Sequence, residues 1–233
     1  MALLLAGCSP SASGPVVADD FDAFYLWTGV RPPAAMDDAQ AVYLLWGELR
    51  KDDPSGIVPL RREVPSADNE EVWLVVRSER LDWEEDAYVA LMREAGRWQK
   101  RANLTGIQVD FDSSTGRLGD YGAFLAEMRR QVPPMLKLSA TGLMDWPANA
   151  SDADLASLRA SLDEIVIQTY QDRTTLPDYA RYLSSLDRLD MPHRVALVEG
   201  GEWDPPAGLE SREGFKGYVV FLLGDQRIGS APR

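Results

Sequence analysis

The stretch LTGIQVDFD (residues 104–112) has the pattern of a buried β-strand whose final residues alternate between polar and apolar side chains. Gln108, Asp110 and Asp112 stand at every second residue and share one face of the strand, whereas Val109 and Phe111 share the other. A carboxylate on the inner face of a buried strand is costly unless it is hydrogen-bonded or functional. We therefore expect Val109 and Phe111 to pack outward on helices and the three polar side chains to point into the mouth of a barrel.

Seven further β-rich runs alternate with helical or loop segments along the chain. Most are almost continuously apolar, which is typical of strands covered on both faces, and they span residues 24–30, 41–49, 71–78, 136–143, 164–171, 194–201 and 217–224. Apolar residues recur at helical spacing in 82–102, 120–132, 152–162 and 176–189. The first, second and seventh connections are shorter and contain Pro and Gly. The pattern predicts an α/β protein, a single parallel eight-stranded β/α (TIM) barrel in which some helices are short or missing.

Composition excludes several classes of function. The net charge of -13 would repel a phosphate backbone, so nucleic acid is not expected as a partner. Cys8 is the single cysteine and His193 the single histidine, so no intramolecular disulfide, Cys/His metal cluster or Ser–His triad can form. No GxGxxG string follows the first run, which removes the main argument for a dinucleotide cofactor. We expect no cofactor and no metal, although a metal site built from Asp and Glu alone stays open, and we expect His193 in a surface turn.

The first twenty residues differ in character from the rest. Residues 1–8 end in Leu-Ala-Gly-Cys after an apolar run, and this string resembles a bacterial lipobox, which implies cleavage before Cys8 and lipidation of its sulfur. Residues 9–20 are small and polar, as in a flexible tether, so the barrel domain is expected to span 21–233. No apolar stretch reaches the roughly 18 residues of a membrane span. We therefore expect a protein of the bacterial cell envelope, on the periplasmic side or at the outer membrane, held by lipid alone.

Polar residues at the C-terminal ends of the strands are the candidates for chemistry, because active sites of β/α barrels lie there. When two aspartates lie close together, their like charges raise the proton affinity of one of them. One carboxyl group then serves as an acid and the other as a base, as cleavage of a glycosidic bond requires. Exposed tryptophans would suit the apolar faces of sugars. Asp110 and Asp112 are the catalytic candidates, and the substrate-binding candidates are Gln108, Asp145, Trp146, Gln168, Tyr170, Gln171, Glu199, Glu202 and Trp203. Core packing is the alternative for each tryptophan and is favoured for Trp27 and Trp46.

The stretch 104–112 resembles the fourth-strand signature D-G-x-D-x-D-x-E of family 18 glycoside hydrolases, the chitinase-like barrels. The resemblance implies that Asp112 is the general acid and that Asp110 orients the 2-acetamido group of the substrate. IQTYQ (167–171) is similar to M-x-Y-D on the sixth strand of that family. Asp112 is one methylene shorter than the family's Glu, and Gln108 and Gln171 replace acids.

A resemblance to another family covers nearly the whole domain. QVDFDS, TGLMDW, QTYQDRTTLPDYARYL, VEGGEWDPP and GYVVFLL are similar to the bacterial family called domain of unknown function 3142, which implies a glycosidase-like barrel but no activity. The leading hypothesis is a polysaccharide-active hydrolase. A carbohydrate-binding barrel without catalysis and an envelope scaffold are the alternatives, and the sugar and the oligomeric state stay open.

Overall fold

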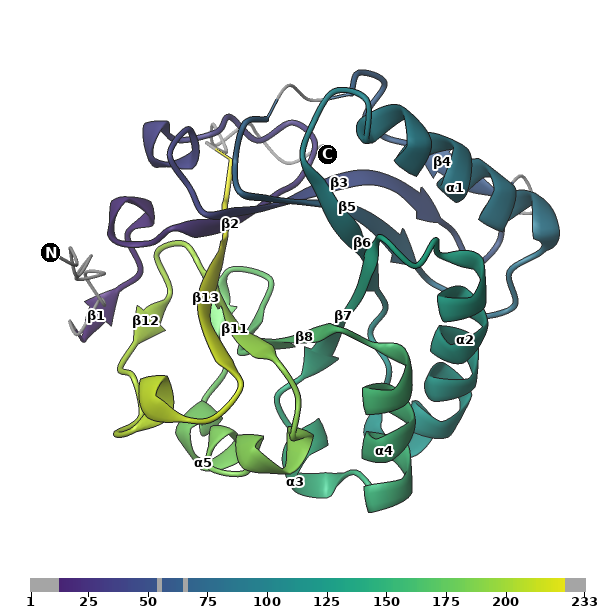
Figure 1. The fold of residues 1–233 in the computed structure, drawn as a ribbon. Coiled ribbons are helices and arrows are strands. Elements are labelled where there is room, and N and C mark those ends of the chain that lie inside the picture. Colours follow the sequence, from purple (N-terminus) through teal and green to yellow (C-terminus); the bar gives the residue numbers. More distant parts are fainter. Residues whose placement is uncertain (1–12, 54–55, 65–66, 225–233) are drawn as a thin grey trace, which may run out of the picture.

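The computed structural model describes residues 13–53, 56–64 and 67–224, and eight parallel strands form a closed barrel within them (Figure 1). Neighbouring strands pair in chain order, and the pairing of Val220 with Phe24 joins the last strand to the first. The predicted eight-stranded barrel is therefore confirmed. Its strands are β2 (Ala23–Leu26), β3 (Ala41–Leu49), β5 (Glu71–Ser78), β6 (Leu104–Asp110), β7 (Lys137–Leu143), β8 (Glu164–Gln168), β11 (His193–Val198) and β13 (Phe215–Phe221).

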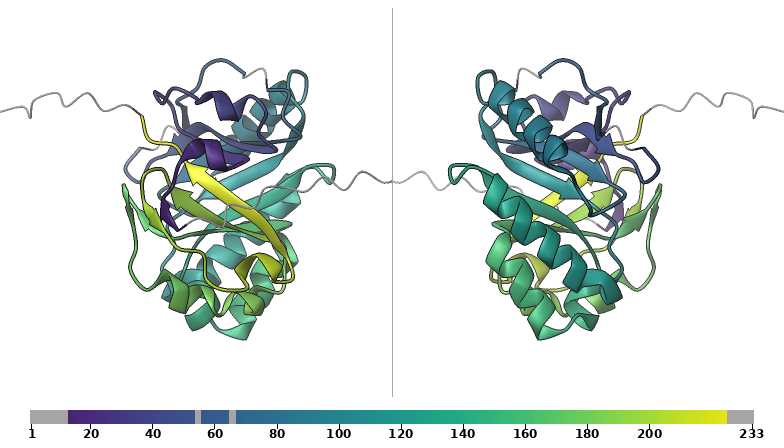
Figure 2. Two further views of the ribbon diagram at one scale, coloured as in Figure 1. Left: turned by 90° about the vertical axis from the view of Figure 1, so that its left-hand side faces the viewer. Right: turned by 90° about the vertical axis from the view of Figure 1, so that its right-hand side faces the viewer.

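Helices cover only part of the barrel. The α-helices are α1 (Glu85–Trp98), α2 (Leu118–Gln131), α3 (Trp146–Asn149), α4 (Asp152–Ser161) and α5 (Tyr179–Leu183), and 3-10 turns span 18–20, 34–36, 115–117, 186–189 and 209–211. Figure 2 shows α1 and α2 along one flank of the barrel. The described residues after β2, β3 and β11 form no α-helix, as their short Pro- and Gly-containing connections predict. None of the described helices is long and apolar enough to cross a membrane.

Short strands complete the connections. β4 (Ile57–Pro59) runs antiparallel to the end of β3, and β9 (Tyr170–Gln171) forms a hairpin with β10 (Thr174–Thr175) directly after β8.

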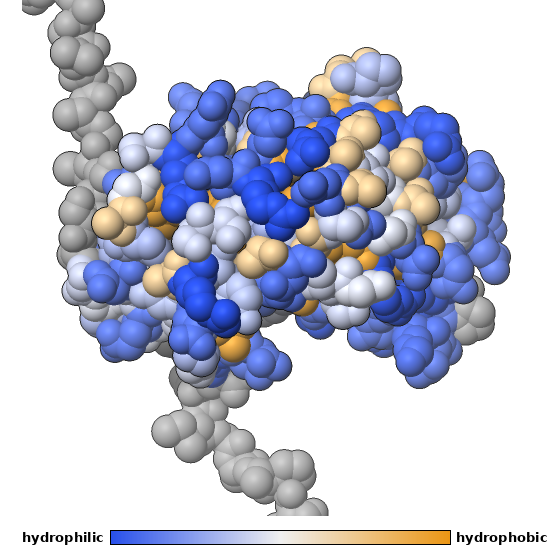
Figure 3. Space-filling view, turned by 90° about the horizontal axis from the view of Figure 1, so that it is seen from below, coloured by the Kyte–Doolittle hydropathy of each residue, from blue (hydrophilic) through white to orange (hydrophobic). Residues whose placement is uncertain are grey.

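The surface drawn in Figure 3 is mostly hydrophilic with scattered hydrophobic side chains.

The sheet separates two apolar layers. The outer layer, between strands and helices, includes Val109 and Phe111, which therefore pack outward as expected. The inner layer fills the barrel with large aromatic side chains, among them Tyr43 and Trp73, whose rings stack at 5.5 Å between centroids. Gly106 on β6 permits this packing, because a Cβ there would lie 2.7 Å from the Trp73 ring and 2.3 Å from the Lys137 carbonyl oxygen.

An ion-paired network fills the N-terminal end of the barrel interior. Arg194 on β11 lies 3.2 Å from Glu164 and 3.2 Å from Glu71, and it donates to the Lys216 carbonyl oxygen. Tyr43 donates to Glu164 at 2.5 Å. Charges this deeply buried are tolerated only when they are paired and hydrogen-bonded, so this network has a structural role.

Two expectations about the periphery are wrong. Residues 13–20 are not part of a free tether, because β1 (Gly14–Pro15) pairs with β12 (Glu202–Trp203) and Val16 is buried. His193 is not in a surface turn, because it is the first residue of β11 and is only 1% exposed, with Nδ1 3.0 Å from the Met191 carbonyl oxygen. Cys8 and the start of the expected tether lie outside the described residues.

Candidate functional site

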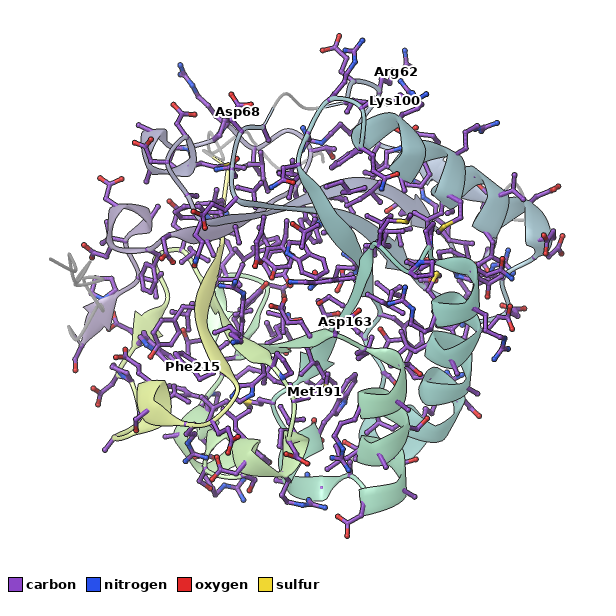
Figure 4. All side chains as sticks on the ribbon, viewed as in Figure 1. Arg62, Asp68, Lys100, Asp163, Met191 and Phe215 are labelled. Atoms are coloured by element: carbon purple, nitrogen blue, oxygen red, sulfur yellow. The ribbon has the colours of Figure 1, made fainter. Side chains whose placement is uncertain are left out.

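A cavity of about 350 Å³ opens at the C-terminal ends of the barrel strands. It therefore lies where active sites of β/α barrels are found. Asp163, Met191 and Phe215, labelled in Figure 4, mark the opposite end, beside the starts of β8, β11 and β13. The cavity is lined by Tyr25, Trp27, Arg77, Asp110, Asp112, Thr141, Val166, Gln168, Tyr170, Gln171, Asp172, Ala196 and Phe221.

Asp110, the last residue of β6, is a carboxyl group of the cavity whose pKa is shifted by its surroundings. Its Oδ1 accepts a hydrogen bond of 2.8 Å from the hydroxyl of Thr141 on β7. Burial raises the pKa of Asp110 and Asp112 raises it further, whereas the Thr141 hydrogen bond and, more weakly, the charge of Arg77 lower it. Because the net pKa shift is upward, Asp110 keeps its proton to a higher pH than an ordinary aspartate.

Asp112 lies two residues beyond Asp110 and is exposed at the cavity. Tyr170 is buried beside both carboxyl groups: burial raises its pKa well above the ordinary value, and Asp110 and Asp112 add to the rise. The Tyr170 hydroxyl is therefore protonated across the physiological range and can donate a hydrogen bond. One cavity thus combines a carboxyl group that resists ionisation, an exposed carboxyl group and a hydroxyl donor.

Gln108 lies beneath the cavity rather than in its wall. It is fully buried, and its Nε2 donates to the hydroxyl of Ser139 at 2.9 Å. Its Oε1 and the Tyr25 hydroxyl are buried without a hydrogen bond of normal geometry, although Gln108 is close enough to lower the pKa of Tyr25. Burial, Tyr170 and Asp110 act in the opposite direction and leave the pKa of Tyr25 well above its ordinary value. Gln108 therefore supports the floor of the site.

The candidates on β8 and its hairpin lie at the cavity. Gln168 and Gln171 line it together with Tyr170, and Gln168 donates to the Tyr170 carbonyl oxygen at 3.0 Å. Asp172, which sequence reasoning missed, lies at the hairpin turn with a φ of 52°.

The candidates after β7 do not line the cavity. Asp145 accepts a 2.6 Å hydrogen bond from Thr115, which places it in a loop contact. Trp146 is fully buried, and its Nε1 donates to the Ser113 carbonyl oxygen at 2.9 Å. Trp146 is therefore not the exposed sugar platform that was expected, because it fixes the loop that follows β6.

The candidates after β11 also lie away from the cavity lining. Glu199 accepts a hydrogen bond of 2.8 Å from the backbone of Leu223. Glu202 is exposed in β12, and Trp203 is buried against Tyr179 with 4.6 Å between ring centroids. The Gly200–Gly201 turn carries Glu202 and Trp203 toward the edge formed by β1 and β12 instead of toward the barrel mouth.

An aromatic wall and a cation are further cavity residues that were not predicted. Trp27, which was expected in core packing, is partly exposed, and its ring lies 5.0 Å from that of Phe221 at 72°. Arg77 enters the cavity from β5. Both positions continue the inward-facing alternation of their strands, and that signal could have identified them. Within the described residues, no group of three His, Cys, Asp or Glu side chains is placed to hold a metal ion.

Comparison with known proteins gives a family and a fold. The family model described as Domain of unknown function (DUF3142) matches residues 79–197. No curated protein matches the sequence. The spore cortex-lytic enzyme SleL of Bacillus cereus superposes with a TM-score of 0.54 at 14% identity over 76% of this chain, which spans only 50% of the enzyme.

Two inhibitor structures share the same fold. The xylanase and alpha-amylase inhibitor protein XAIP-II from Scadoxus multiflorus gives a TM-score of 0.53 at 13% identity, over 85% of this chain and 92% of its own. XAIP-I, solved in complex with trehalose, gives 0.52 at 12% identity over the same shares. At these identities the likeness establishes the barrel fold and not the activity.

Proposed function

The chain belongs to the DUF3142 family, and we propose that the cavity at its barrel mouth binds a polysaccharide and hydrolyses a glycosidic bond in it. The observation that carries this proposal is the pair of carboxyl groups in one cavity, Asp110 with a raised pKa and Asp112 exposed beside it. Such a pair can hold a proton for the leaving oxygen and keep a negative charge for the cationic transition state.

The roles follow from the surroundings of each carboxyl group. Asp112 is the exposed member and can approach the glycosidic oxygen as general acid. Asp110 holds the proton of the resting pair because its pKa is raised. In the reactive form this proton is on Asp112, and Asp110, fixed by Thr141, is the carboxylate that stabilises positive charge near the anomeric carbon. The Tyr170 hydroxyl is available as a donor to the substrate, and Trp27 and Phe221 offer apolar edges to a sugar ring.

A carbohydrate-binding barrel without catalysis is the second candidate. Gln108, Asp112 and Gln171 stand where the chitinase-like signature has more acidic or longer side chains. Inhibitor proteins share the fold, and one of them was solved in complex with trehalose. A binding role therefore has as much support from the likeness to these inhibitors as hydrolysis has from the likeness to a lytic enzyme.

A glycan array followed by a reducing-end assay tests both candidates. We expect the wild-type protein to bind a subset of glycans and to release new reducing ends from them. Binding without release, across oligosaccharides long enough to span the barrel mouth, would leave only the binding role, and no binding to any glycan would contradict both.

We also propose that Cys8 is lipidated and anchors the protein in the bacterial envelope. The proposal rests on the Leu5-Ala6-Gly7-Cys8 string alone. Palmitate labelling in a bacterial host should be lost in Cys8→Ser, and labelling that persists in this variant would contradict the anchor.

A further inference from the structure

Arg77 is the cationic residue of the cavity lining, and the proposed chemistry assigns it no role. It lies on β5 one residue before the end of the strand, and it lines the cavity with Asp110 and Asp112. Its partners in register are Glu48 on β3 and Asp110 on β6. The two strands beside Arg77 thus both carry a carboxyl group at its level.

Neither carboxyl group neutralises the Arg77 guanidinium. Glu48 forms an ion pair with Arg50, and Asp110 accepts its hydrogen bond from Thr141 on the far side. Among the described residues, none forms a hydrogen bond with Arg77 or an ion pair within 4.0 Å of it. Its charge lowers the pKa of Asp110, and this effect is smaller than those of burial, Thr141 and Asp112.

The other arginine of the barrel interior shows the contrast. Arg194 has its guanidinium bonded to Glu71, Glu164 and a carbonyl oxygen at the closed end of the barrel. Arg77 is only partly exposed and lines the open cavity, where its donors have no hydrogen-bond acceptor among the described residues. A guanidinium in a partly desolvated cavity is a strong site for a ligand carboxylate, because its planar fork binds both oxygens at once.

We propose that Arg77 binds a carboxylate of the saccharide, so that the ligand of the barrel mouth is an acidic polysaccharide with uronic acid or similar carboxylated units. This inference rests on the proposed function. Asp112 and Asp172 also line the cavity and would attract a cationic sugar, but both are exposed and their charges are screened by solvent. Arg77 is more enclosed, so its charge acts on the ligand with less screening.

Calorimetric titration with matched oligosaccharides tests the inference. The acidic probes are tetramers of galacturonate, mannuronate and hyaluronan, the neutral probes are the same tetramers after reduction of each carboxylate to a hydroxymethyl group, and the cationic probe is a chitosan tetramer. We expect the wild-type protein to bind an acidic tetramer at least about tenfold more tightly than its reduced form, as one charge-assisted hydrogen bond would give.

Substitutions locate the source of this preference. Arg77→Gln should abolish the preference, so that the acidic tetramer and its reduced form bind with equal affinity, and Arg77→Lys, which keeps the charge but loses the fork, should retain part of the preference. Arg173→Gln is the control, because Arg173 is an exposed neighbour in the same hairpin as Asp172 but does not line the cavity. Preference for reduced or chitosan tetramers, or an acidic preference that survives Arg77→Gln, would overturn the inference and leave the proposed function intact. Absence of binding to every probe would overturn the inference, and it would contradict the proposed function as well only if no glycan of the array binds.

Discussion

Replacing Thr141 by valine should make the stability of the protein more sensitive to pH. The hydroxyl of Thr141 donates a 2.8 Å hydrogen bond to Asp110, and this bond lowers the pKa of the carboxyl group against the effect of burial. Thr141→Val preserves the shape of the side chain but removes the donor. The pKa of Asp110 should therefore rise further above its ordinary value.

The magnitude follows from the two charge states of Asp110. A hydrogen bond to an ionised group contributes about 1.5–3 kcal/mol and a neutral one about 0.5–1.5 kcal/mol. At neutral pH we expect a loss within the first range, which lowers the melting temperature by roughly 2–4 °C per kcal/mol for a chain of this size. Near pH 3, where Asp110 is protonated in the folded and the unfolded protein, the loss should fall to the second range.

The raised pKa of Asp110 makes the stability of the wild-type protein depend on pH as well. Because the folded-state pKa of Asp110 is raised, the folded protein binds the proton more tightly than the unfolded chain does. Stability is therefore lost as pH rises from the ordinary aspartate pKa to the raised one. Thermal melts of wild type, Thr141→Val and the exposed control Thr174→Val across pH 3–8 measure the effect. Equal destabilisation by Thr141→Val at every pH would refute the reasoning.

Three further predictions concern residues outside the proposed chemistry. Trp146→Phe removes the indole donor to Ser113 and should cost about 1–3 kcal/mol in urea unfolding without changing saccharide affinity; weaker binding by the folded variant would place Trp146 in the site after all. Gly106→Ala should cost at least about 1–3 kcal/mol, because its methyl group would lie 2.3 Å from a carbonyl oxygen, and urea unfolding that matches the wild type would contradict the close approach. Burial lowers the pKa of His193, so stability should fall as pH drops below the ordinary histidine value of 6.5, and His193→Gln should reduce that loss in acid melts; an unchanged acid limb would show that His193 is not responsible.

The barrel could be predicted because each strand is a local feature of the sequence. Apolar runs bounded by Gly, Pro and charged residues correspond to all eight strands, including β3 and β5, which match their predicted runs at both ends. The predicted helix at 176–189 is divided into α5 and a 3-10 turn, with Asp178 in a left-handed conformation before it. Residues 13–20 were misjudged because their pairing partner, β12, lies near the other end of the chain, and composition carries no information about such a partner.

The candidates on β6 and β8, or within three residues of their ends, line the cavity or support its floor, whereas the candidates after β7 and β11 do not. Asp110 and Gln168 end their strands, and strand alternation fixes the side to which they point. Trp146 and Glu199 lie just beyond strand ends, where the direction of the chain depends on contacts with Ser113 and Leu223 that only the fold establishes.

The most direct test of the account is the release of reducing ends by the wild-type protein and by Asp112→Asn, on whichever glycan the protein binds. The substitution removes a proton donor with almost no change in shape, and loss of general acid catalysis typically slows turnover by about 10² to 10⁴-fold. Glu202→Gln is the matched control, because Glu202 is exposed in β12 and does not line the cavity. The account predicts that all three proteins bind the glycan, that Glu202→Gln releases reducing ends at the wild-type rate, and that Asp112→Asn is slower by this factor. Equal release by Asp112→Asn and the wild type would contradict it.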